Sequence, residues 1–175
     1  SSIAAERFGS KVGGLIGGLP STIVVTLLFI GLTQTAERAA ESAVIVPLVM
    51  GLNGIFVTVF ILLSRRGLAP ALAGALLTWF SLASLLIGVN IRALWISLLG
   101  WLLLAVGCFL VVERGMKIVS QGRKAAHYTA GQIAGRAALA GTVVAFAVLM
   151  SKVAGPLAGG IFATFPAVFL SNLII

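Results

Sequence analysis

Side chains that could carry out acid-base, nucleophilic or metal chemistry are few in this chain. The sequence has no Asp, and its four acidic residues all lie at the ends of apolar segments, at Glu6, Glu37, Glu41 and Glu113. His127 is the only histidine and Cys108 the only cysteine. Paired carboxylates inside the membrane and a Ser-His-Asp triad are therefore excluded within this sequence. We expect no enzymatic activity, no catalytic residue, no metal and no cofactor.

Two elements rich in glycine and proline are stronger candidates for a functional site. GGLIGGLPST spans residues 13–22, and GGIFATFPAV spans residues 159–168. Aligning the glycine pairs places Pro20 on Pro166, and SKV precedes both copies. Proline lacks an N–H and glycine tolerates non-helical backbone. Each element is therefore expected to break a helix and to offer backbone polar groups to a small solute.

The candidate substrate-binding residues are small or polar residues in these elements and one amide in the second apolar segment: Gly17, Gly18, Pro20, Ser21, Thr22, Asn53, Thr164 and Pro166. Glycines four residues apart also let membrane helices pack closely, and two such pairs occur, Gly14 with Gly18 and Gly155 with Gly159. Asn53 also has two interpretations. Its amide could line a polar path, or it could make a hydrogen bond between helices.

The composition indicates that lipid surrounds most of these residues. The 175 residues are 60% hydrophobic and 9% charged, with a mean hydropathy of +1.18, whereas soluble domains carry about 25% charged residues. The apolar segments are long and continuous, which favours helices over strands. We expect an all-α, polytopic transmembrane helix bundle with about six spans, near residues 13–33, 44–64, 69–89, 93–112, 137–151 and 156–175.

Basic residues are distributed unevenly over the two predicted sides of the membrane. Nine of the 12 Lys and Arg residues fall on the side that holds Ser1, and the other three are Arg38, Arg92 and Lys152. The positive-inside rule then places Ser1 and the basic loop 114–136 on the cytoplasmic side of an inner or plasma membrane. The net charge of +8 is explained by this orientation, so we expect the lipid bilayer as a partner and no nucleic acid.

Two groups of charged residues keep two interpretations each. Glu37, Arg38 and Glu41 form either an external gate or a solvated turn with a short interfacial helix, on which Glu37 and Glu41 would share one face. Lys11 and Lys152 precede the two glycine and proline elements. They either attract an anionic substrate or extend to the lipid headgroups.

The whole chain, residues 1–175, is predicted to be a single integral membrane domain. Its repeat halves would be residues 1–92 and an incomplete 136–175, joined by the span 93–112 and the loop 113–135. The two elements would enter the membrane from opposite sides, which is typical of the inverted-topology repeats of secondary transporters. We therefore predict a carrier of a small solute that works by alternating access. The alternative is a structural or assembly subunit, in a homo-oligomer or a larger membrane complex.

Lys11, Gly14-Leu15, Pro20 and Glu37-Arg38 resemble motif residues of the GlpM-like family of small bacterial membrane proteins. The resemblance covers roughly residues 10–90 and restarts near residue 136. It implies an arrangement of helices and no substrate, because the activity of that family is not established. It also implies further helices before Ser1 and after Ile175. Since the chain opens on Ser1 and closes within an apolar segment, we expect either a fragment or a processed chain.

Overall fold

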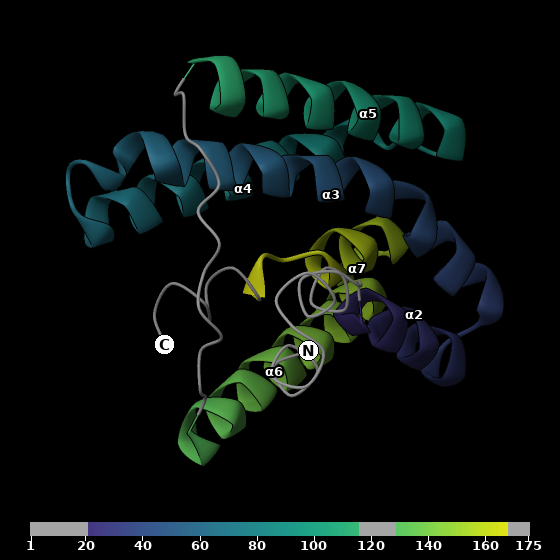
Figure 1. Ribbon diagram of the computed structural model, residues 1–175. Helices are drawn as coiled ribbons and strands as arrows, with labels where there is room; N and C mark the ends of the chain where they lie inside the picture. The colour runs from purple at the N-terminus through teal and green to yellow at the C-terminus, as the bar shows by residue number, and fades with distance from the viewer. Residues whose placement is uncertain (1–20, 116–128, 168–175) are drawn as a thin grey trace, which may run out of the picture.

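The computed structural model describes residues 21–115 and 129–167, and its regular elements are helices (Figure 1). In chain order they are α2 (Ser21–Thr33), α3 (Ala36–Ser64), α4 (Leu68–Val89), α5 (Leu94–Leu110), the π-helical turn η1 (Val111–Gly115), α6 (Ala130–Ala154) and α7 (Pro156–Ala163). No strand occurs within these two ranges. The predicted all-α fold is confirmed.

Four helices of the described ranges are long and apolar enough to cross a membrane: Ala36–Ser64, Leu68–Val89, Leu94–Arg114 and Ala130–Ala154. Ser21–Thr33 is apolar but shorter. Large hydrophobic side chains are exposed on the outer helices, for example Trp95 and Leu103 of α5, which are 65% and 73% exposed. Such surfaces are unfavourable in water and normal against lipid. The fold is that of a helical membrane protein.

Helix α3 lies at the centre of the molecule and contacts α2, α4, α5 and α7. In Figure 1, α3, α4 and α5 lie side by side and alternate in direction, whereas α6 crosses the molecule obliquely. The short helix α7 packs between α3 and α6. The buried core follows this arrangement, with Val49 and Phe56 from α3, Trp79 from α4 and Ile161 from α7.

Two predicted helix boundaries are corrected by side-chain caps. Helix α3 begins at Ala36 instead of residue 44, because the Thr35 hydroxyl accepts a hydrogen bond from the backbone N–H of Arg38 at 3.2 Å. Helix α6 begins at Ala130 instead of residue 137, because Thr129 and Gln132 form a capping box. The segment that holds Glu37 and Glu41 is therefore the first two turns of α3, and part of the predicted basic loop is helical.

Helix α5 packs on α3 across glycines. A Cβ added at Gly51 of α3 would lie 2.9 Å from Leu104 of α5, and one at Gly54 would lie 3.3 Å from the Cys108 sulfur. On the α5 side of the same contact, Gly100 leaves room for the side chain of Leu48 from α3. The helices approach closely because these positions have no side chain. The glycines beside Asn53 thus serve the contact with α5.

Candidate functional site

The second glycine and proline element overlaps a short helix, α7, that has a break at each end. Helix α7 has eight residues and is about 12 Å long, far less than a membrane span requires. It starts after Gly155, whose φ of +94° is open to glycine and strained for other residues. It ends at Ala163, and its C-cap Thr164 lies two residues before Pro166. The predicted span 156–175 is therefore interrupted, as its glycine and proline residues indicate.

Glycines hold α7 in close contact with both of its neighbours. A Cβ added at Gly159 would lie 2.5 Å from the Cβ of Ser151, in the last turn of α6. A Cβ at Gly160 would collide with the backbone carbonyl of Ser42 in α3 and meet Ile45. Helix α3 bends along its first half (Figure 1), and Pro47 lies inside it, which is a common cause of a helix bend. Helix α7 is therefore wedged between α6 and α3.

Asn53 connects α7 to α3 and α4 through its side-chain amide. Its Nδ2 donates a hydrogen bond to the backbone carbonyl of Thr164 at 3.0 Å. Its Oδ1 accepts one from Trp79 Nε1 at 2.9 Å. Asn53 is 8% exposed and Trp79 1%, so both polar groups depend on these partners. The Asn53 amide thus makes hydrogen bonds between helices, which is the second of the two interpretations that the sequence allowed.

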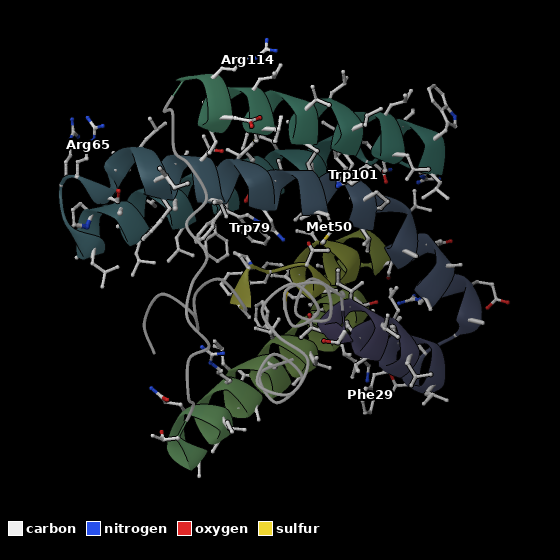
Figure 2. All side chains as sticks on the ribbon, viewed as in Figure 1. Phe29, Met50, Arg65, Trp79, Trp101 and Arg114 are labelled. Carbon is white, nitrogen blue, oxygen red and sulfur yellow. The ribbon has the colours of Figure 1, made fainter. Side chains whose placement is uncertain are left out.

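The break after α7 is closed by local hydrogen bonds and aromatic contacts. The Thr164 hydroxyl donates to the Ile161 carbonyl at 2.7 Å, and the Phe165 N–H donates to the Phe162 carbonyl at 3.1 Å. The Phe165 ring meets Trp79 edge to face, with the centroids 5.3 Å apart (Trp79 is labelled in Figure 2). Thr164 and Pro166 are buried. The backbone that leaves the helix is thus covered by protein, as the membrane interior requires.

A polar cleft of about 490 Å³ lies at the other end of α7. Its lining comes from the first turns of α3, the end of α4 and the junction of α6 with α7: Glu41, Val44, Ile87, Asn90, Ile91, Arg92, Ala154, Gly155, Pro156 and Leu157. Glu41 and Arg92 are both exposed. Among the described residues, neither one has an ion-pair partner within 4.0 Å. Two residues of opposite charge therefore line one cleft without forming an ion pair with each other.

The first glycine and proline element is described only at its end. Gly14, Gly17, Gly18 and Pro20 lie outside the described residues. Ser21 and Thr22 line an apolar groove of about 720 Å³ between α2 and α6, together with residues such as Phe29 and Val144. This groove is separate from the cleft beside Glu41. The structure thus brings Asn53 and Thr164 into contact and places Ser21 and Thr22 elsewhere.

The predicted glycine pair Gly155 and Gly159 does not share a helical face. Gly155 is the junction residue between α6 and α7, and a Cβ there would meet nothing within 4 Å. It lines the polar cleft, whereas Gly159 packs against α6. Gly155 therefore permits the positive φ at the junction of α6 and α7, and Gly159 permits the close contact between these two helices.

Sequence reasoning missed three polar side chains that position these helices. Trp79 donates to Asn53, and Gln34 accepts a hydrogen bond from the Ser151 hydroxyl at 3.4 Å. Gln34 also donates to the Val148 carbonyl at 3.5 Å, so it ties the turn between α2 and α3 to α6. An indole N–H within an apolar segment needs an acceptor. Because the preceding span contains the amide of Asn53, the sequence could have indicated a hydrogen bond between Trp79 and Asn53.

Comparisons with known proteins give a family and no activity. The curated proteins and the solved structures contain no match to this chain. The resemblance to the GlpM-like family is not confirmed by the family that matches. The matched ranges leave out residues 93–132, which include α5. The chain belongs to the family described as "Protein of unknown function (DUF3147)", whose model matches residues 1–92 and 133–175.

Proposed function

We propose that this chain is a carrier that moves a small solute across the membrane by alternating access between two inverted halves. The observation that carries the proposal is the polar cleft beside α7. Glu41, Asn90 and Arg92 line it from the proposed first half, and residues 154–157 line it from the second. Secondary transporters bind their solutes between such halves, beside helices that are interrupted.

In this proposal the cleft is the open side of the carrier and the far end of α7 is the closed side. Asn53, Thr164, Trp79 and Phe165 pack together at that far end. Opening toward the other side would separate Phe165 from Trp79 as α6 and α7 rock against α3 and α4.

The proposed orientation places the cleft on the outside of the cell. Arg65 and Arg114 lie near the ends of α3 and α5, away from the α2–α3 turn (Figure 2). Arg38, Arg92 and Lys152 lie in the first turns of α3, after α4 and in the last turn of α6. The positive-inside rule favours a cytoplasmic location for the end with Arg65 and Arg114.

A reversible cross-link over the cleft tests the carrier function. In a Cys108→Ala background, Ile87→Cys and Leu157→Cys place one thiol on each side of the cleft. The protein is reconstituted in liposomes, and flux is measured for a panel of neutral, anionic, cationic and zwitterionic solutes. A bifunctional methanethiosulfonate should reduce flux of the transported solute at least about tenfold, since rocking is blocked, and dithiothreitol should restore it.

The same variant treated with a monofunctional methanethiosulfonate is the control for simple blockage of the cleft. Flux that persists when the two thiols are cross-linked would overturn the alternating-access proposal. No flux of any solute in the panel above that of empty liposomes would overturn carrier function as such.

Close glycine packing favours a second candidate, a structural subunit. Five glycines face neighbouring side chains or backbone, namely Gly51, Gly54, Gly100, Gly159 and Gly160, whereas Gly155 lines the cleft. Dry helix contacts of this kind are what a packing subunit needs. This candidate predicts no solute flux in the liposome assay.

A further inference from the structure

The charges of the cleft suggest which class of solute it binds. Glu41, which carries a carboxylate, and Arg92, which carries a guanidinium, line the same cleft of about 490 Å³. No partner within 4.0 Å neutralises either one among the described residues. Opposite charges at a shared cleft that do not pair directly are free to bind a ligand that carries both signs.

We infer that the cleft binds a small zwitterion, with its carboxylate at Arg92 and its ammonium group at Glu41. This inference rests on the proposed carrier function and names the solute. Arg presents a planar set of donors that matches a carboxylate, and Glu41 offers an acceptor for an ammonium group. Asn90, which ends α4 in a left-handed conformation, adds an amide to the lining.

The remaining walls limit the size and polarity of the solute. Val44, Ile87, Ile91 and Leu157 supply apolar surface between the polar groups. An apolar wall favours a short aliphatic body and gives little stabilisation to a second pair of charges. A simple anion would leave Glu41 without a partner, and a simple cation would leave Arg92 without one. The zwitterion is the class that satisfies both charges.

Equilibrium binding to the purified protein in detergent tests this inference without any need for transport. The zwitterionic probes are leucine, 4-aminobutyrate and glycine betaine. They differ in the distance between the two charges or in the type of ammonium group. 4-Methylpentanoate and 3-methylbutylamine are near-isosteres of leucine that lack its ammonium and its carboxylate, respectively. At least one zwitterion should bind about tenfold more tightly than either single ion, because a charge-assisted contact is lost in each.

Two charge removals and one exchange assign the contacts. Glu41→Gln should weaken binding of the zwitterion about tenfold and leave binding of 4-methylpentanoate unchanged. Arg92→Gln should also weaken binding of the zwitterion about tenfold, but it should leave binding of 3-methylbutylamine unchanged. The double exchange Glu41→Arg with Arg92→Glu should recover zwitterion binding to within about threefold, since both signs are present again. Glu37→Gln and Lys152→Gln are the controls, because these exposed charges do not line the cleft.

Each outcome separates the two proposals. If none of the zwitterions binds, if a single ion binds as tightly, or if both charge removals have no effect, the zwitterion inference is overturned. Charge-dependent zwitterion binding without flux in liposomes would keep the inference and remove the carrier function. Flux that ignores Glu41 and Arg92 would keep the carrier and remove the inference.

Discussion

A single primary amide, that of Asn53, joins three helices. Replacing it with Ala would leave the Trp79 N–H and the Thr164 carbonyl buried without their partner. We predict that Asn53→Ala lowers the free energy of unfolding by about 1–3 kcal/mol. The measurement is unfolding in detergent, with Ser84→Ala as the control because Ser84 is an exposed polar residue of a neighbouring span. Equal stability of the two variants would contradict the assigned role.

The pairing of Asn53 with Trp79 can be isolated from general packing. Trp79→Phe keeps an aromatic ring and removes the indole donor. In a double-mutant cycle, Asn53→Ala and Trp79→Phe should therefore show a coupling of about 0.5–1.5 kcal/mol, because both remove the same hydrogen bond. Strict additivity would mean that the two residues act separately.

At the scale of elements, α7 depends on glycine at its contact with α3. A methyl group at Gly160 would collide with the Ser42 carbonyl, which is backbone and cannot turn away. We predict that Gly160→Ala lowers the free energy of unfolding by about 1–3 kcal/mol. Gly141→Ala is the matched control, since a Cβ at that position of α6 meets nothing within 4 Å. It should be neutral or stabilising by up to about 1 kcal/mol. If Gly141→Ala were the less stable of the two variants, the close contact of α7 with α3 at Gly160 would be refuted.

The long helices could be predicted from the sequence because each contains a long apolar segment, but α3 and α6 begin well before the predicted spans. The caps at Thr35 and Thr129 let α3 and α6 begin before their apolar segments. A hydropathy pattern does not detect these polar first turns. Pro166 and its glycines correctly indicated an interrupted segment. Its length could not be predicted, because α7 ends where Asn53 and Trp79 hold the Thr164 carbonyl and Phe165 ring. Those contacts join residues far apart in the sequence.

For the whole molecule, the predicted residues Asn53 and Thr164 lie at one end of α7, and the cleft lies at the other. Asn53 and Thr164 do meet, but the cleft depends on Glu41, Asn90 and Arg92, which come together only because α3, α4 and α7 converge. The charges of Glu41 and Arg92 looked like separate surface features in the linear chain. Nothing in their spacing, 51 positions along the chain, indicated a shared cleft. Tertiary convergence of this kind is not encoded in local pattern.

The inversion of the two halves is the central claim of this account, and it concerns the whole molecule. Lys11 and Lys152 occupy equivalent places in the two SKV sequences. In a Cys108→Ala background, Lys11→Cys and Lys152→Cys are introduced one at a time and treated with a membrane-impermeant maleimide from each side of sealed vesicles. Inverted halves predict labelling from opposite sides, with residue 11 accessible from the cytoplasmic side. Labelling of both residues from the same side would contradict the inverted repeat and the carrier mechanism built on it.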